Sequence, residues 1–274
     1  MRILIGFLAG LACLVPGVTP SFAAQDLPIF DAHIHYSQPA WDPYPPDAAL
    51  GILDRGGVSR AMVSSTPDDG TLRLYEKAPR RIVPILRPYR SRDDMGSWTK
   101  DPSVLAYVED RLKRGIYRGI GEFHLSGGEA GDPVPRGFAD LAARHKIFLH
   151  CHCDEAGVEG LARLRPDVLV LWAHAGMSSS ASAVEGVVAR HPNVWVELAL
   201  RSDVAPGGVL DPAWRAVFLK YPDRFVVGTD TWINAQWDRL PAILENFRTW
   251  LRQLPPDVAA KIAHGNAERL VAVP

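Results

Sequence analysis

The chain has no surplus of charge of either sign. Its 274 residues contain 30 Lys and Arg against 31 Asp and Glu. A nucleic-acid-binding protein needs basic side chains to neutralise phosphates, so the composition argues against a nucleic acid partner. Hydrophobic residues at 47% and charged residues at 22% are typical of a folded globule, which argues against a disordered or coiled-coil chain.

Cysteine is scarce, with only Cys13, Cys151 and Cys153 present. Cys151 and Cys153 stand two apart in an apolar run, where one extended strand would hold their Cα atoms about 6.5 Å apart. We expect no bond between them in that geometry, and interpret them as small buried residues facing the helices behind a strand. The sequence thus predicts a fold that does not depend on disulfide bonds.

Long hydrophobic runs are missing after residue 23. Before it, Arg2 precedes an apolar run over 3–18, and small residues surround a cleavage position after Ala23, the pattern of a secretory signal peptide. A retained membrane anchor is the alternative, but glycine and proline interrupt the run. We predict a signal peptide over 1–23, one domain over 24–274, and a periplasmic or secreted protein without membrane contact after cleavage.

Short runs of β-branched and apolar residues recur, each followed by a helix-like segment. This alternation is typical of βαβ units, and eight of them predict a single-domain α/β protein, a (β/α)₈ TIM barrel. A doubly wound open sheet is the alternative. It usually has a glycine-rich turn after its first strand, where this chain has none. The predicted strands are 28–35, 60–65, 82–87, 118–124, 147–152, 168–174, 194–200 and 225–230.

Local signals mark several helix ends. Pro46 begins a helix that ends before Gly56, Asp211 caps a helix that starts at Pro212, and Asn266 is predicted to cap the last helix. No composition shift or long polar linker divides the chain, which also favours one domain.

Six of the nine histidines fall at or within two residues of the end of a predicted strand. In a (β/α)₈ barrel these ends converge on the face where active sites are built, so residues far apart in the chain would meet around one cavity. His145, His191 and His264 lie elsewhere and are interpreted as surface or capping residues. The six are His33, His35, His124, His150, His152 and His174.

The first strand and the fourth supply the clearest metal-ligand signals. His33 and His35 point the same way from a strand and can bind one cation, with Asp31 expected to orient a ligand imidazole. Glu122 lies in an apolar strand, where a carboxylate needs a metal or, in the alternative, an ion pair with Arg118. With later strand ends added, the nitrogen and oxygen donors suit Zn²⁺ or a similar divalent ion. The candidate ligands are His33, His35, Glu122, His150, His174 and Asp230.

Taken together, these motifs resemble the metal-dependent amidohydrolase superfamily. The matching residues are Asp31-Ala32-His33-Ile34-His35, the histidines that end strands five and six, Gly228-Thr229-Asp230 and Asn266-Ala267-Glu268-Arg269-Leu270. The chain is most similar to the amidohydrolase-related branch, which contains hydrolases, lactonases and nonoxidative decarboxylases. Gly121-Glu122 also resembles the TatD-like branch, where a strand-four Glu bridges two metals.

The resemblance implies an amidohydrolase-type catalytic domain with one or two divalent metals. It implies that His33, His35, His150 and Asp230 contact metal, and that His174 is a second ligand or a partner of the attacking water. No lysine stands at strand four, so a second metal would depend on Glu122. Strand five offers both His150 and His152, and strand four adds His124, which leaves the ligand there open.

A divalent metal lowers the pKa of bound water to about 7, and a neighbouring carboxylate can take the proton. Asp230 is the predicted base, and His174 is predicted to orient or protonate the tetrahedral species. His150 is predicted to bind metal and His152 to face substrate.

Substrate contacts are predicted for His124 and His152, and for Arg87 and Arg201, which end strands three and seven. Ordinary surface charge is the alternative for the arginines. We predict a hydrolase of a small, anionic ester, lactone, amide or phosphoester. The alternatives are a decarboxylase of an aromatic or unsaturated acid and a periplasmic metal- or solute-binding protein without turnover.

Overall fold

The computed structural model describes residues 27–272, so the predicted signal peptide lies outside the described residues. Eight parallel strands pair in chain order from β1 to β8, which confirms the (β/α)₈ barrel. The strands are β1 Ile29–Ile34, β2 Val58–Val63, β3 Ile82–Leu86, β4 Gly119–Leu125, β5 Phe148–Cys153, β6 Val170–Trp172, β7 Val194–Glu197 and β8 Phe225–Val226.

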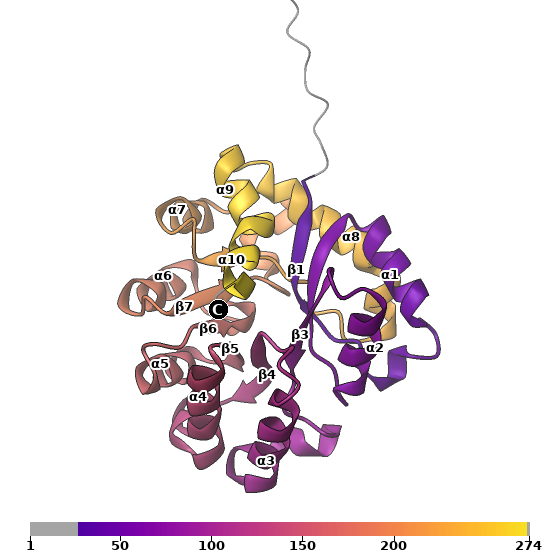
Figure 1. The fold of residues 1–274 in the computed structure, drawn as a ribbon. Helices are drawn as coiled ribbons and strands as arrows, with labels where there is room; N and C mark the ends of the chain where they lie inside the picture. The colour runs from indigo at the N-terminus through magenta and orange to yellow at the C-terminus, as the bar shows by residue number, and fades with distance from the viewer. Residues whose placement is uncertain (1–26, 273–274) are drawn as a thin grey trace, which may run out of the picture.

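Helices surround the strands in a ring, and α10 lies near its centre (Figure 1). Asp211 caps α7 as predicted, because its side chain accepts from the backbone N–H groups of Ala213 and Trp214. The helices are α1 Pro46–Arg55, α2 Asp69–Lys77, α3 Pro102–Leu112, α4 Pro133–His145, α5 Glu155–Leu164, α6 Ala181–Arg190, α7 Pro212–Lys220, α8 Asn234–Leu251, α9 Pro256–Ala260 and α10 Asn266–Ala272. No helix among the described residues has the length and apolarity needed to cross a membrane.

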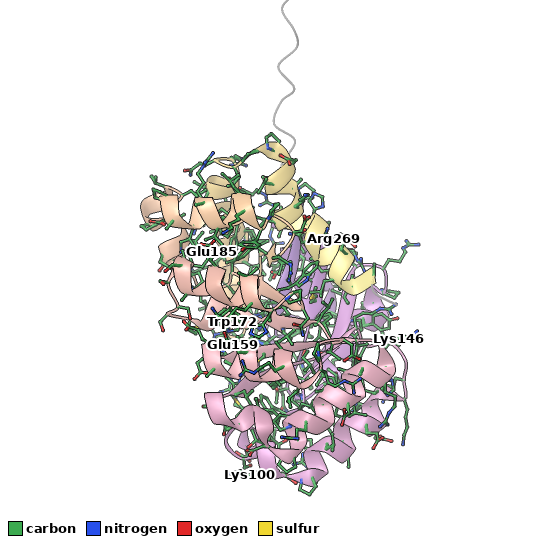
Figure 2. All side chains as sticks on the ribbon, turned by 90° about the vertical axis from the view of Figure 1, so that its left-hand side faces the viewer. Lys100, Lys146, Glu159, Trp172, Glu185 and Arg269 are labelled. Carbon is green, nitrogen blue, oxygen red and sulfur yellow. A yellow bond between two sulfur atoms is a disulfide. The ribbon has the colours of Figure 1, made fainter. Side chains whose placement is uncertain are left out.

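Two apolar layers hold the barrel. The larger lies between strands and helices, and a smaller one fills the barrel interior with residues such as Phe30, Met62 and Phe148. Leu270 and Val271 of α10 join the interior cluster, so this helix covers the N-terminal ends of the strands. Figure 2, a side view, shows Arg269 of α10 and Lys146, which precedes β5, on the same side of the molecule. The opposite, C-terminal end is left for the candidate site.

The barrel closes between β8 and β1 with few ladder hydrogen bonds. Ala32 donates its N–H to Val227 O at 2.9 Å, and an isolated bridge joins Ile34 to Thr231. The buried Asp31 carboxylate adds to this seam by accepting from the N–H and the hydroxyl of Thr229 at 2.9 and 2.8 Å. The expectation that Asp31 orients a ligand imidazole was therefore wrong. Its carboxylate instead joins the last strand to the first.

The predicted strands six to eight extend too far. Their last predicted residues, His174, Leu200 and Asp230, have φ angles of 56°, 60° and 46° and lie outside the ladders. This left-handed backbone is uncommon for residues with a side chain and often marks functional positions. The chain therefore leaves strand geometry where the site residues stand.

Two further expectations were wrong. Cys151 and Cys153 form a disulfide, since β5 holds their Cα atoms 5.7 Å apart, closer than a fully extended strand and within the range a disulfide spans. Asn266 does not cap a separate last helix, because α9, a π-helical turn over Lys261–Gly265 and α10 run on without a break. Its side-chain amide instead donates to the carbonyl oxygens of Pro222 and Phe225.

Candidate active site

Four buried side chains each bring one ligand atom to the centre of the barrel mouth, namely those of His33, His35, Glu122 and Asp230. His33 Nε2 lies 3.1 Å from His35 Nε2 and 3.5 Å from Asp230 Oδ1. His35 Nε2 lies 3.2 Å from both Glu122 Oε2 and Asp230 Oδ1. Tetrahedral ligands about 2.1 Å from a cation are about 3.4 Å apart, so the four atoms have the spacing of ligands around one divalent ion.

The other ring nitrogens of the two histidines are held by acceptors. His33 Nδ1 donates to Glu197 Oε2 at 3.1 Å, and His35 Nδ1 donates to the carbonyl oxygen of Ser64 at 2.6 Å. In the neutral rings this leaves the Nε2 lone pairs facing Glu122 and Asp230, as metal binding requires. Glu197 was missed in the sequence, although it lies inside a predicted apolar strand, which is the same signal that identified Glu122.

Glu122 connects this group to a second one. Its Oε1 lies 3.0 Å from His152 Nδ1 and 3.2 Å from His174 Nε2. Its Oε2 accepts from an Arg87 guanidinium nitrogen at 3.1 Å, and Arg87 Nε also donates to the Glu122 carbonyl oxygen. The alternative ion pair with Arg118 is not formed, because Arg118 is exposed at the other end of the barrel. One carboxylate thus serves two sets of nitrogen ligands.

Irregular pairing explains how Glu122 reaches the centre. Gly121 pairs with His150 and Phe123 with Cys151, so Glu122 is an extra residue in the β4–β5 ladder. Such a bulge re-aims a side chain at the edge of a barrel. Gly121 has a φ of 141°, and a Cβ there would lie 2.1 Å from the His150 carbonyl oxygen, so the position requires glycine. β1 has a comparable register shift between Asp31 and Ile34, beside His33.

Electrostatics at the centre favour a cation. Burial lowers the pKa of His33, but the carboxylates of Asp230 and Glu122 outweigh it and raise that pKa well above its usual value. Burial raises the pKa of Glu122, yet the charge of His33 and hydrogen bonds from histidines hold it well below the usual range. Two anions therefore face imidazoles that must lose their protons when a metal binds, so acid is expected to release the metal.

His150 lies at the site on the Glu197 side. Its Nε2 is buried without a hydrogen-bond partner, and its ring centroid is 4.4 Å from that of His33. Burial, followed by the charge of His33, holds the pKa of His150 well below its usual value. With His33 and Glu197 it offers a separate set of ligand atoms, whereas His152 faces Glu122.

The predicted substrate contacts divide into two groups. His124 stacks on His152 with ring centroids 4.5 Å apart, and burial lowers its pKa to about 4. Arg201 pairs with Asp203 at 2.7 Å and donates to the carbonyl oxygens of Ala175 and Ser179, so it fastens loops. His124, His152 and Arg87 line the mouth, and Arg201 does not.

A cavity of about 300 Å³ opens over the carboxylates and histidines. It is a size that holds a small molecule. Most of the residues that line it are polar or charged, and the apolar ones are Met95, Leu200 and Trp232. Besides the residues above, it is lined by Arg92, Met95, Leu200 and Trp232. Arg92 and Met95 had not been identified from the sequence.

A metal-dependent hydrolase of the barrel type is the class that this fold and cluster define. A family model described as amidohydrolase matches residues 96–273, more than half of the chain, and the protein therefore belongs to this family within the metal-dependent amidohydrolase superfamily. The comparison with curated proteins returns no significant match.

Solved structures share the fold at low identity. A candidate 2-pyrone-4,6-dicarboxylic acid hydrolase from Pseudomonas putida is 16% identical, with a TM-score of 0.64 over 90% of this chain and 98% of that one. A TatD homologue from Escherichia coli K12 is 18% identical, with a TM-score of 0.62 over the same shares. The N-acetyl-D-glucosamine-6-phosphate deacetylase of Mycobacterium smegmatis is 17% identical, with a TM-score of 0.58 over 90% and 76%.

Proposed function

We propose that the protein hydrolyses a small, anionic ester, lactone, amide or phosphoester at this metal site. The observation that supports it is a set of four ligand atoms beneath a cavity open to small molecules: two histidine nitrogens 3.1 Å apart, each 3.2–3.6 Å from a Glu122 and an Asp230 oxygen.

His33, His35, Glu122 and Asp230 would hold one divalent ion, for which we propose Zn²⁺. Glu122 and His152 would hold a second, together with His174 beside Glu122 Oε1 or with His124, whose ligand atom groups with theirs. The distances to Glu122 Oε1 favour His152 as the strand-five ligand, the role predicted for His150. His150, with a partnerless Nε2 beside His33, remains the alternative ligand.

A divalent cation supplies polarisation of the scissile carbonyl or phosphoryl group and lowers the pKa of water. Asp230 lies where it can accept the proton of the attacking water, since its Oδ1 faces both strand-one histidines. His174 Nε2 lies 3.9 Å from Asp230 Oδ2, so it is placed to receive that proton or to orient the reacting oxygen. Arg87 donates to the Glu122 carboxylate, which is shared by the two ligand sets, and so holds it in position.

The test begins with metal analysis of protein purified without chelator. We expect one or two divalent ions per chain, and the paired variants His152→Ala and His150→Ala discriminate the ligand sets. Loss of one ion in His152→Ala only supports the set above, whereas loss in His150→Ala only reverses the assignment.

Activity is then assayed on esters, lactones, amides and phosphodiesters, alongside CO₂ release from aromatic and unsaturated acids. Metal-dependent hydrolysis in the first panel is the expected result. CO₂ release without hydrolysis would assign the protein as a decarboxylase, and a metal-loaded protein inactive in every assay would favour a binding role.

We also propose that the chain is exported to the periplasm or secreted after cleavage behind Ala23, from the charged and apolar pattern of its first residues. Intact mass of the exported protein should match a chain starting at Ala24. Retention of Met1 in a membrane fraction would contradict this.

A further inference from the structure

The arginines near the mouth are not equally available to a ligand. Arg87 is committed to Glu122, and Arg201 to Asp203 and loop carbonyls. Arg92 lines the cavity, and its side chain has no hydrogen bond, ion pair or ring contact with any of residues 27–272. An arginine with five donors and a fixed charge is therefore left facing the cavity without a partner.

The segment that carries Arg92 is held in place by its neighbours. The Asp94 carboxylate accepts from the backbone N–H, Nε and a terminal nitrogen of Arg90, at 2.7, 3.1 and 2.7 Å. Arg90 also reaches Asp101 at 3.1 Å, and Trp98 Nε1 donates to the carbonyl oxygen of His124 at 2.9 Å. The loop is thus built before ligand binds, which lowers the entropic cost of using Arg92.

Apolar side chains stand around the same cavity. Met95, Leu200 and Trp232 line it with exposed fractions of 39%, 50% and 46%, which is unusual for large hydrophobic residues. Leu200 keeps its exposed position on left-handed backbone at a φ of 60°. An apolar rim beside a partnerless guanidinium fits a ligand with an apolar body and one anionic group.

We propose that Arg92 determines specificity by binding the carboxylate of a substrate whose apolar body packs against Met95, Leu200 and Trp232. A single guanidinium matches a planar monoanionic carboxylate in a bidentate pair. A phosphate dianion would need more hydrogen-bond donors than the Arg92 guanidinium alone supplies. This proposal rests on the proposed function, because hydrolysis at the metal would act on the other end of the substrate. Recognition of the carboxylate is measured separately from hydrolysis, as binding.

The test is calorimetric binding of 4-phenylbutyrate and of neutral 4-phenylbutyramide to the Zn²⁺-loaded protein. Wild type should prefer the carboxylate, and Arg92→Gln should weaken the carboxylate by about 10–100-fold with little change for the amide. Trp232→Ala should weaken both ligands to the same degree. Arg215→Gln is the matched control, because Arg215 is an exposed arginine of α7 that lines none of the cavities described.

An unchanged carboxylate preference in Arg92→Gln would overturn the proposal, since the anion would then be bound by the metal. Equal weakening of both ligands would also overturn it and make Arg92 a structural residue. Tighter binding of phenyl phosphate than of 4-phenylbutyrate, lost in Arg92→Gln, would replace carboxylate by phosphate. Arg92-dependent binding without hydrolysis of any compound would leave this inference standing and refute the proposed hydrolase.

Discussion

Two cavities of nearly equal volume lie at opposite ends of the barrel. The one at the N-terminal ends of the strands measures about 310 Å³, and the one at the mouth about 300 Å³. The charged residues of the first, Arg118, Lys146 and Asp167, are all exposed to water. At the mouth, Glu122 and Asp230 are only 2% and 7% exposed. Arg87 pairs with Glu122, whereas Asp230 faces only histidines. Size therefore does not distinguish a site, but a buried carboxylate that faces histidines in place of an arginine or lysine does.

The two ends of the barrel also differ in how many residues have left-handed backbone. Six residues other than glycine have positive φ angles within 27–272. Lys146 lies at the N-terminal end of the barrel, and the others lie at the mouth, namely His174, Ala175, Met177, Leu200 and Asp230. Lys146 ends α4, where such a conformation is an ordinary helix terminus. Strain is concentrated where the chemistry is, and stability is supplied from the opposite end.

Asp230→Asn should give the largest effect at the mouth. The amide keeps one oxygen near His33 and His35 but cannot accept a proton, so we expect kcat to fall at least about 10²-fold with metal largely retained. Steady-state kinetics beside metal analysis of the same sample measure both quantities. Near-normal turnover in the metal-loaded variant would move the base to Glu122 or His174.

Leu270→Ala tests the other end. Leu270 is 2% exposed in the interior cluster, and removing its side chain should lower the free energy of unfolding by about 2–5 kcal/mol. Urea unfolding measures this cost, while kcat per folded, metal-loaded molecule should stay unchanged. A loss of kcat as large as that of Asp230→Asn would break the separation between the two ends.

Glu197→Gln tests whether the carboxylate behind His33 contributes to metal affinity at the mouth. Glu197 Oε2 accepts from His33 Nδ1, so losing the carboxylate should weaken metal affinity by about 10–100-fold without removing a ligand. Competition with a chelator gives the affinity. Glu185→Gln is the control, because Glu185 is a partly exposed glutamate of α6 that pairs with Lys220 and does not line the cavity (Figure 2). It should leave the metal affinity unchanged, and equal affinities in the two variants would contradict the role of Glu197.

Asp68→Asn asks whether buried charge alone is enough to mark a site. Asp68 is fully buried, hydrogen-bonded to Tyr117 and 3.6 Å from Arg111, and burial raises its pKa to about 6. A folded-state pKa above the unfolded value means that the wild type gains stability as pH falls through about 6 and levels off below about 4. The titration of Asp68 changes the free energy of unfolding by at most about 3 kcal/mol.

The Asp68→Asn variant lacks that titration, so the difference in unfolding free energy should shift in its favour as pH rises from about 4 to about 7. Chemical unfolding of both metal-free proteins across this range measures the difference. A pH-independent difference, or a large loss of kcat, would show that Asp68 has another role.

The sequence was sufficient for the barrel because eight apolar runs and their capping residues are local signals. The ends of β6 to β8 were placed too late, since the left-handed backbone at His174, Leu200 and Asp230 is imposed by tertiary contacts. The roles of His150 and His152 depend on the bulge at Glu122, which changes the pairing of β4 with β5 and has no local signature.

Substrate contacts were the hardest to predict. Arg87 directly follows β3, whereas Arg201 lies in the loop after β7, which ends at Glu197. Whether an arginine is free depends on partners distant in sequence, such as Glu122 for Arg87. Arg92 is recognisable only once those partners are known. Glu197, by contrast, could have been found by applying to β7 the reasoning used for β4.

The seam between β1 and β8 has a consequence for biosynthesis. His33 and Glu122 lie in β1 and β4, His35 directly follows β1, and Asp230 follows the last strand, where Asp31 accepts hydrogen bonds from Thr229. A chain that still lacks β8 therefore has three of the four candidate ligands and lacks Asp230. We expect the ligand set of the proposed metal site to be complete only once β8 has closed the barrel, so that a partly synthesised chain would not hold the metal as the whole protein does.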